Sequence, residues 1–238
     1  NTGALVNTYF GESITHCSAE GTINLTRGTS LGHRIGGLVG HVSNFTTNWE
    51  VSDCVNNCAI TLALTKDETS QTTFVGGVVA DSTNDKTNMT TITCTNNINN
   101  GVINVTGDSA ATVIVGGIMG RYINYLSNFT NCHNTAKLSA TLGSSTLVQM
   151  AGIFAHCVMG SSSPVGYDTA ATNCSNSGDI SLKLTGNTDA AATGYSCVGG
   201  CFGIWQHVHQ ANITVTNCDN SGDISVTSEG TIKGQYHL

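Results

Sequence analysis

The sequence has few charged residues, few aromatic residues and only one proline. Asp, Glu, Lys and Arg make up 10% of the 238 residues, Phe, Trp and Tyr make up 6%, and Pro164 is the single proline. No stretch approaches the roughly 18 consecutive apolar residues that a membrane-spanning helix needs. With only eight Lys and Arg and a net charge of −7, the chain lacks the basic patches that bind nucleic acids or anionic membrane surfaces. We therefore expect no nucleic-acid partner and no membrane insertion.

The abundant residues are those of strands and turns. The chain contains 28 Gly, and Thr, Asn and Ser take the place of the Lys and Glu that usually cover a protein surface. This composition is unfavourable for helices and favourable for short strands bounded by turns. The length is sufficient to bury a sizeable core.

The chain consists of internal repeats that can be aligned on six cysteines spaced 37 to 44 residues apart. The repeats begin near Cys17, Cys54, Cys94, Cys132, Cys174 and Cys218. A turn-and-strand phrase follows each cysteine, for example SNSGDISLKL after Cys174 and DNSGDISVTS after Cys218. A Gly-rich phrase comes later in each unit, as in IGGLVGH (35–41) and VGGIMGR (115–121). This agreement indicates a single repeat domain over residues 1–238, without a second domain.

Each phrase is a short alternating run bounded by Gly, Asn or Ser, which is typical of a β-strand. In IVGGIMG, Ile114 and Ile118 are expected to share one face of a strand. A unit with about three strands cannot bury its apolar face alone, but stacked units bury a continuous core. We therefore predict an all-β fold, a β-solenoid in the form of a parallel β-helix, with adjacent turns roughly 4.8 Å apart. The alternative layout is a row of antiparallel hairpins or sheets, one per repeat.

The stretch IGGLVGHVSNFTTNWEVSDCVNNCAIT (35–61) resembles the GLUG repeat, a motif named for its glycine-leucine-any-glycine core. The core is GLVG at 37–40, and NSGDIS at 176–181 and 220–225 fits the Asn-rich turn and strand that follow it. The resemblance covers nearly the whole chain. It implies a repeat architecture of the kind found in large cell-surface and secreted proteins, including adhesin-like proteins. It brings no catalytic residues, and the cysteine in every repeat departs from the family pattern.

The two ends of the chain are complementary parts of one repeat. Residues 2–5 align with 116–119, so that the chain begins in the second half of a repeat and ends after the first half of another. One explanation is a segment of a longer repeat chain. The other is a subunit that polymerises head to tail, because an uncapped end exposes strand edges that can pair with the next chain. The contact residues would then include Asn1, Gly3, Leu5, Ile232, Tyr236 and Leu238.

The ten cysteines are expected to be either disulfide bonded or buried as free thiols. Stacked repeats would place the six aligned cysteines above one another, with Cα atoms within the roughly 4.4–6.8 Å that a disulfide allows, so Cys17–Cys54 is one candidate pair. A bridge from Cys157 to Cys197 or Cys201 is another. The connectivity cannot be deduced from sequence, and the alternative is a ladder of small buried core residues.

Asn-x-Ser/Thr sequons predict glycosylation if the protein is made by a eukaryote. They occur at Asn24, Asn44, Asn88, Asn104, Asn128, Asn173 and Asn212. Several of them come shortly before an aligned cysteine, which would place them on one region of the surface. Because Asn and Thr are abundant, some sequons are expected by chance, and in a bacterium these would be plain Asn turns.

No motif in the sequence indicates an enzyme. Glycoside hydrolysis needs two carboxylates facing one cleft, and Asp179 and Asp223 are interpreted as exposed turn residues at equivalent repeat positions rather than as a Ca²⁺ site. His207 and His209 alternate on one strand, with His156 one turn away, but surface histidines are commoner than metal ligands. There is no Ser-His-Asp arrangement and no phosphate-binding loop. We expect no catalytic residues, no metal and no cofactor.

The motifs recur in every repeat, whereas a catalytic or binding site occurs once, and this favours a structural role. We predict an extracellular or cell-surface structural protein, a subunit or segment of a filament or stalk, whose partner is a second copy or the rest of a longer chain. The alternative is an adhesin-type module that binds a carbohydrate or a host protein through Tyr122, Tyr125, Trp49 and Trp205. An enzyme acting on polysaccharides is the third interpretation.

Overall fold

The computed structural model is built from β-strands throughout. It describes residues 1–28, 32–43, 48–65, 71–83, 90–107, 112–123, 125–143, 147–159, 169–185, 196–207, 212–229 and 236–237, with the backbone alone at 125, 158–159, 206–207 and 236–237. Within these ranges every element is a strand. The same ranges contain no helix of the length and apolarity that crossing a membrane requires.

The strands form four parallel sheets, which we name A to D. Sheet A contains β1 (Thr2–Gly3), β5 (His33–Gly36), β9 (Thr73–Gly76), β14 (Val113–Gly116), β19 (Val148–Ala151), β24 (Ser196–Gly199) and β29 (Tyr236–His237). Sheet B contains β2 (Val6–Tyr9), β6 (Val39–Ser43), β10 (Val79–Thr83), β15 (Met119–Ile123), β20 (Phe154–Met159) and β25 (Phe202–His207). Sheet C contains β3 (Ser13–Thr15), β7 (Trp49–Ser52), β11 (Thr90–Thr95), β16 (Tyr125–Thr130), β21 (Thr169–Thr172) and β26 (Ile213–Thr216).

Sheet D is the longest of the four. It contains β4 (Ser18–Gly28), β8 (Val55–Thr65), β12 (Ile98–Asn99), β13 (Ile103–Gly107), β17 (His133–Asn134), β18 (Leu138–Leu142), β22 (Ser175–Asn176), β23 (Ile180–Leu184), β27 (Asp219–Asn220) and β28 (Ile224–Ser228). β8 is continuous, whereas a turn around Gly101 divides the corresponding segment of the next repeat into β12 and β13. β8 therefore pairs with both of these strands.

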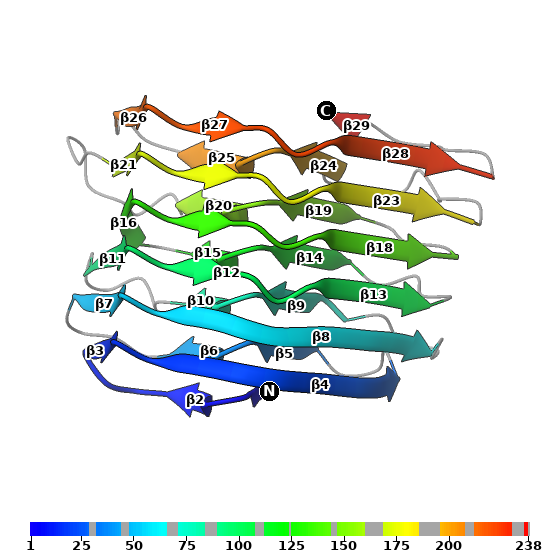
Figure 1. Ribbon diagram of the computed structural model, residues 1–238, viewed down its shortest axis with the longest axis horizontal. Helices are drawn as coiled ribbons and strands as arrows, with labels where there is room; N and C mark the ends of the chain where they lie inside the picture. The colour runs from blue at the N-terminus through cyan, green and yellow to red at the C-terminus, as the bar shows by residue number, and fades with distance from the viewer. Residues whose placement is uncertain are drawn as a thin grey trace.

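Successive repeats lie above one another as layers (Figure 1). Layers 1 to 6 comprise β1–β4, β5–β8, β9–β13, β14–β18, β19–β23 and β24–β28. Every described pairing is parallel and joins a strand to its counterpart in the next layer, for example Val79 to Met119. The antiparallel-hairpin alternative is therefore wrong for the described strands. The arrangement is consistent with a β-solenoid.

The Gly-Gly phrase spans a corner between two sheets and is not one strand. β14 ends at Gly116 and β15 begins at Met119. Ile118 lies in the interior, whereas Ile114 packs with Phe74 on the other side of sheet A. The expectation that Ile114 and Ile118 share one face is wrong, because the chain turns between them.

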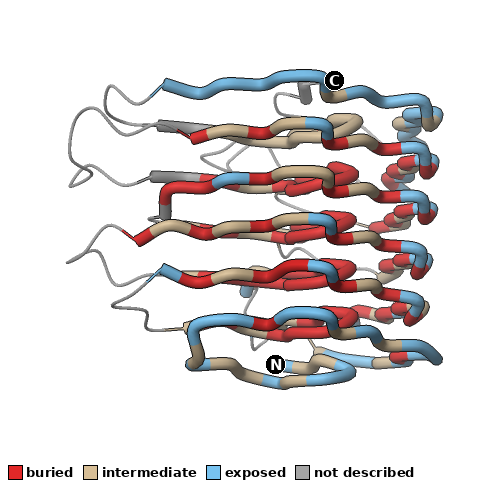
Figure 2. The backbone as a smooth tube through the Cα atoms, turned by 60° about the vertical axis from the view of Figure 1, so that its left-hand side comes forward, coloured by how far each residue is buried: buried red, intermediate tan, exposed pale blue. Residues whose placement is uncertain are grey.

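The interior contains two hydrophobic clusters, one between sheets B and C and the other between sheets A and D. In the second, alternate residues of the strands, such as Ile103 and Val105 of β13, face Val115 of β14. In the first, Tyr122, Phe129 and Phe154 stack with ring centroids 5.1–5.7 Å apart. Figure 2 shows that the buried residues follow these inner faces through the middle layers and that the uppermost layer is largely exposed.

A column of asparagines connects the layers between the two clusters. It consists of Asn56, Asn99, Asn134, Asn176 and Asn220, and we call it the asparagine ladder. The Nδ2 of each of the first four donates to the Oδ1 of the asparagine in the next layer at 2.6–2.7 Å. The Nδ2 of all five also donates to the backbone carbonyl two residues further along the chain at 2.8–3.2 Å. The buried amides are therefore satisfied, and every bond between them ties one layer to the next.

The second glycine of each Gly-Gly phrase makes room for this ladder. A Cβ on Gly77 would lie 2.4 Å from Cγ of Asn99 and 2.0 Å from the carbonyl oxygen of Gly117. A Cβ on any of the equivalent glycines would likewise lie only 2.3–2.6 Å from a side-chain atom of the asparagine beside it; these glycines are Gly37, Gly117, Gly152 and Gly200. Layer 5 keeps this second glycine although Ala151 replaces the first.

Layer 1 lacks both partners of this contact. Ala19 stands in register with Asn56, and Gly3 pairs with Gly36, so that Ala4 takes the position of the second glycine. The sequence alignment that set Gly3 opposite Gly117 is therefore displaced by one residue. Where the asparagine is absent, the glycine is absent too, which is the expected result if the glycine exists to accommodate the amide.

The ladder predicts a position-dependent cost of removing an asparagine. Asn134→Ala leaves an amide N–H of Asn99 and the Oδ1 of Asn176 without their buried partners, and we expect a loss of about 3 kcal/mol in the free energy of unfolding. Asn220→Ala, at the exposed end of the ladder, should cost about 1 kcal/mol. Urea unfolding of both variants measures the difference. Equal losses would show that the ladder does not carry this stability.

Candidate functional site

A column of charged and polar side chains lies on sheet B, outside the hydrophobic interior. The outer sides of sheets A and B meet at an angle, where Phe74, Ala80, Ile114 and Ala155 form a small third cluster. Beside this cluster, four residues of sheet B lie in successive layers. They are His41, Asp81, Arg121 and His156, and we call them the charged column.

Asp81 is the centre of the charged column. Its side chain is fully buried and accepts hydrogen bonds from Nε of Arg34 at 2.5 Å and from Nε and Nη2 of Arg121 at 2.7 and 3.0 Å. The guanidinium carbon of Arg121 lies 3.8 Å from the ring centroid of Phe74, and that of Arg34 lies 5.6 Å from it. One carboxylate thus joins arginines from the layers below and above, and an aromatic ring supports both.

The environment lowers the pKa of Asp81, His41 and His156, but for different reasons. Burial raises the pKa of Asp81, but hydrogen bonds and charge from Arg121 and Arg34 outweigh it, and the pKa lies below its usual value. Burial, with the charge of Arg121, lowers the pKa of His156 to about 4. Burial also lowers the pKa of His41, whose Nε2 lies 3.6 Å from Asp81. At neutral pH the histidines are neutral, and the arginines outnumber the carboxylate.

This arrangement suits an electrostatic cross-link better than acid–base chemistry. A carboxylate held ionised by two guanidinium groups is a weak base, and no second carboxylate faces it among the described residues of the column. Asp81 joins layers 2, 3 and 4 instead. This column was not predicted from the sequence. The chain has only three arginines, at 27, 34 and 121, and their rarity is the one feature of the sequence that distinguishes these positions.

The predicted cysteine column is correct in five layers and wrong in one. Backbone bonds place Cys17 beside Cys54, Cys132 beside Cys174 and Cys174 beside Cys218. In layer 3 the position belongs to Asn97, whose Nδ2 donates to the carbonyl of Val51 at 2.8 Å and lies 3.9 Å from Sγ of Cys132. Cys94 pairs with Val51 and Phe129 instead.

The prediction fails in layer 3 because the repeats differ in length. A constant spacing in the sequence therefore does not identify the residue that lies beside Cys54 in the next layer. Asn97 lies 43 residues beyond Cys54, with its Oδ1 accepting from the Cys54 amide, and 35 residues before Cys132. A sequence alignment that equalises the spacing selects Cys94. Cys94 and Asn97 are both buried, so burial alone does not distinguish an alignment that sets Cys94 beside Cys54 from one that sets Asn97 there.

All ten cysteines are free thiols in this structure, and disulfide formation stays a prediction. Cys157 and Cys201 pack on the same interior cluster. Cys197 pairs with Gln149 and so faces the opposite side of sheet A from Val198, which lies in the interior. Burial raises the pKa of Cys201 to about 12, with a contribution from neighbouring Cys218, so these thiols are protonated at neutral pH and weakly nucleophilic.

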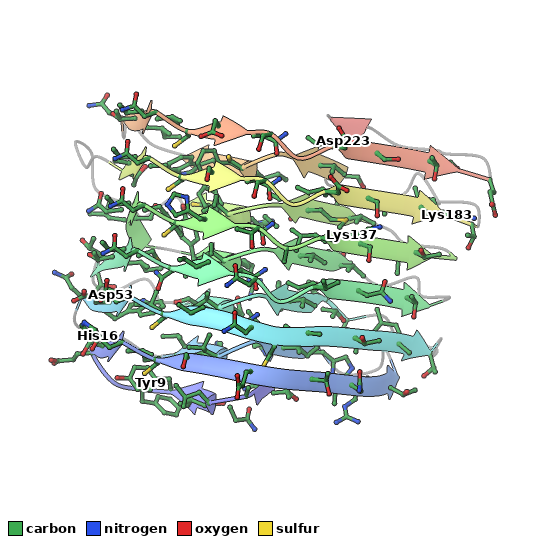
Figure 3. All side chains as sticks on the ribbon, viewed as in Figure 1. Tyr9, His16, Asp53, Lys137, Lys183 and Asp223 are labelled. Carbon is green, nitrogen blue, oxygen red and sulfur yellow. The ribbon has the colours of Figure 1, made fainter. Side chains whose placement is uncertain are left out.

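A second polar column follows the corner between sheets C and D on the outer surface. Its six residues have φ of 52–55° and are His16, Asp53, Asn96, Asn131, Asn173 and Asn217. Amide groups link Asn96 to Asp53 at 2.8 Å and Asn131 to Asn96 at 3.1 Å. Asn and Asp tolerate this left-handed conformation better than other side chains with a Cβ. Figure 3 shows His16 and Asp53 at this edge.

The sequons occupy different surroundings. Asn24, Asn128, Asn173 and Asn212 are exposed. Asn104 is half-buried, with its Oδ1 accepting from Ser139 at 2.9 Å. The Nδ2 of Asn173, the atom that would carry a glycan, donates to Asn131 at 3.2 Å. Asn44 and Asn88 lie outside the described residues, and glycosylation of the sequons stays a prediction.

The four aromatic residues predicted to bind a ligand do not all lie on the surface. Trp49 and Tyr122 are buried in the core, so they do not form a surface platform for a ligand. Trp205 is half-buried against the same core, and the side chain of Tyr125 is outside the description. The expected use of Trp49 and Tyr122 in binding is therefore wrong, because aromatic residues at inward strand positions fill the interior.

The predicted acidic pair is stacked as expected. Asp179 and Asp223 are both exposed, and the amide of Asp223 donates to Oδ1 of Asp179 at 3.1 Å. His156 was expected to lie one layer from His207. The residue opposite His207 is Met159, so His156 lies three residues before that position. His209 lies outside the described residues. Among the described residues, no group of three or more His, Cys, Asp or Glu could hold a metal ion.

The outer layers expose apolar side chains. Leu5 and Phe10 of layer 1 are 47% and 65% exposed. Ile213 and Val215 of layer 6 are 40% and 52% exposed, and Ile224 is also exposed. Asn1 is exposed and Gly3 half-buried. Of the other predicted contact residues, Tyr236 is described by its backbone alone, and Ile232 and Leu238 lie outside the description.

Comparisons with protein families, with curated proteins and with solved structures found no match to this chain. The resemblance to GLUG repeats therefore stays a prediction.

Removal of the Asp81 carboxylate should destabilise the fold strongly. Asp81→Asn leaves two guanidinium groups without their anion, and we expect a loss of about 3–5 kcal/mol in the free energy of unfolding. Asp179→Asn makes the same change at an exposed turn and should alter stability by less than about 0.5 kcal/mol. Denaturant titration of the two variants measures both. A loss below 1 kcal/mol for Asp81→Asn would contradict the cross-link.

The lowered pKa of His156 predicts that stability falls in mild acid. Above about pH 6.5 this histidine is neutral in both states and adds no pH dependence. As the pH falls towards 4, the unfolded chain binds the proton first, which costs up to about 3 kcal/mol of stability. In His156→Gln, stability should fall less with decreasing pH, and the remaining loss of stability should be the smaller one caused by His41. In His16→Gln, a change at an exposed position, stability should fall with pH as in the unchanged protein. Unfolding curves from pH 7.5 to 4.5 provide the test, and an unchanged slope in His156→Gln would refute it.

Proposed function

We propose that the chain is a stretch of parallel β-helix that acts as a structural rod, a subunit or segment of an extracellular or cell-surface filament or stalk. The asparagine ladder carries this proposal. It joins layers 2 to 6 without interruption, uses the same bond in each layer, and leaves the number of layers open. A repeat that contacts only its neighbours is suited to extension along one axis.

The exposed faces of layers 1 and 6 support stacking of further layers. Each presents strand edges and apolar side chains, including Leu5 on one face and Val215 on the other. Unpaired parallel edges recruit further strands in register, which gives backbone hydrogen bonds and apolar burial together. The partner is another layer of the same kind, from a longer repeat chain or from a second copy.

A further layer of a longer chain and layer 1 of a second copy differ in the ladder bond that they can form with Asn220. A head-to-tail contact would place Ala19 of the second copy over Asn220, so that one ladder bond, worth about 1 kcal/mol, would be missing. Burying the remaining surface of Ile213, Val215 and Ile224 would contribute about 3 kcal/mol, from roughly 2 kcal/mol for each fully buried side chain. Apolar burial therefore outweighs the missing bond, so the missing bond does not by itself prevent a second copy from stacking.

Electron microscopy of the native protein, with intact mass on the same sample, tests the proposal. We expect elongated rods or fibres of constant width, built either from stacked chains of about this length with added sugar or from one longer repeat chain. Compact particles at every protein concentration would contradict a structural rod.

A pair of variants makes the test specific to the end face. Val215→Asp places a charge on the apolar face of layer 6, whereas Thr216→Asp introduces the same charge on a nearby, outward position of β26 and leaves the Asn212 sequon intact. If chains stack, Val215→Asp should shorten the fibres or weaken association at least tenfold in sedimentation experiments, and Thr216→Asp should not. Equal behaviour of the two variants would exclude stacking through this face.

A further inference from the structure

In the described layers the column of cysteines is interrupted in layer 3. Asn97 occupies the column there, and its Oδ1 accepts from the backbone amide of Cys54 at 3.2 Å. Its Nδ2 lies 3.9 Å from Sγ of Cys132. Layers 1 and 2 carry the cysteines below Asn97, and layers 4 to 6 carry those above it. Cys132 therefore has a cysteine beside it in the column on one side only, which is Cys174.

The backbones of Cys132 and Cys174 are held one layer apart. On one side of the pair, the amide of Asn131 donates to the carbonyl of Thr172 at 3.0 Å. On the other side, the amide of Ser175 donates to the carbonyl of Cys132 at 3.0 Å. Adjacent strands of a sheet are roughly 4.8 Å apart, and a disulfide allows Cα atoms to be roughly 4.4–6.8 Å apart. The layer spacing therefore suits a bridge without any change of register.

The side chains of Cys132 and Cys174 point into the same interior. Both are fully buried members of the hydrophobic cluster between sheets B and C. Hydrogen bonding with the Cys132 thiol, together with burial, raises the pKa of Cys174 well above its usual value. The two thiols are therefore neighbours, and closing an S–S bond of roughly 2.05 Å requires rotation of side chains that already face the same way.

We propose that Cys132 and Cys174 form a disulfide that links layers 4 and 5 when the chain folds in the presence of a small-molecule disulfide. Cys174 has a cysteine on each side, Cys132 and Cys218, but pairing it with Cys218 would leave Cys132 without a partner in the described column. Cys218 still has Cys201 close by, because Sγ of Cys201 donates to the carbonyl of the residue after Cys218 at 3.0 Å. The bond is independent of the structural role proposed above, because it joins two layers of one chain.

The bond forms by two successive thiol–disulfide exchanges. The thiolate of one cysteine attacks a sulfur of oxidised glutathione, which releases one reduced glutathione and leaves a mixed disulfide. The thiolate of the other cysteine attacks the protein sulfur of that mixed disulfide and releases the second glutathione. The two protein thiols are oxidised, their protons pass to the two glutathione thiols, and the disulfide of the oxidant is reduced. Because the folded thiols are buried and protonated, these steps precede the closure of layers 4 and 5.

Refolding followed by peptide mapping tests the pairing. The full chain is unfolded and reduced, refolded with reduced and oxidised glutathione, alkylated, and digested with trypsin and chymotrypsin without further reduction. Cleavage after Lys137 and Tyr167 places Cys132, Cys157 and Cys174 in separate peptides. We expect the peptide with Cys132 to be linked to the peptide with Cys174, and this species to disappear on reduction. Alkylation of both cysteines, or linkage of either to another cysteine as the main product, would overturn the proposal.

Matched variants separate this bond from oxidation of cysteines in general. Cys132→Ala removes one partner, whereas Cys197→Ala removes a half-buried cysteine on the outer side of sheet A and should keep the linked peptide. A disulfide that joins two layers raises stability, so reduction should lower the urea midpoint of the unchanged protein and of Cys197→Ala by more than that of Cys132→Ala. Equal shifts in all three proteins would contradict a bond between layers 4 and 5.

Discussion

The contact between a buried asparagine and the glycine opposite it is the constraint on which the layered structure depends. The amide needs partners because it is buried, and the next layer supplies them at 2.6–2.7 Å. The glycine is needed because any Cβ at Gly77 would overlap both the amide and the neighbouring backbone. One polar column therefore sets the register of sheet D and the position of the corner between sheets A and B, and the two hydrophobic clusters form on either side of it.

Constant layers are built from repeats of unequal length. Successive ladder asparagines are separated by 43, 35, 42 and 44 residues, yet the paired strands keep their register throughout. The differences are absorbed between the strands, at the connections from sheet B to sheet C and from sheet D to sheet A. Such connections can change in length at small entropic cost, whereas a strand that slips by one residue turns its apolar side chains outward.

The charged column and its surroundings are a local exception to this uniformity. Asp81, Arg34 and Arg121 replace the small or apolar side chains found at neighbouring positions, such as Ile114 and Ala155. They link three layers through one carboxylate. Regular layers and a local charged corner thus coexist in the described part of the chain.

The all-β class, the repeat and the strand phrases were readable from the sequence alone, because composition, spacing and alternation report local preferences that every layer shares. The Gly-Gly corner, the substitution of Asn97 for Cys94 in the cysteine column and the burial of Trp49 and Tyr122 were not. Each depends on which residues of adjacent layers lie side by side. Because the connections between strands differ in length, the spacing of residues in the sequence does not report which residues lie side by side. Only the tertiary structure aligned the asparagines into a ladder and brought Arg34 and Arg121 to Asp81, because both are contacts between residues distant in sequence.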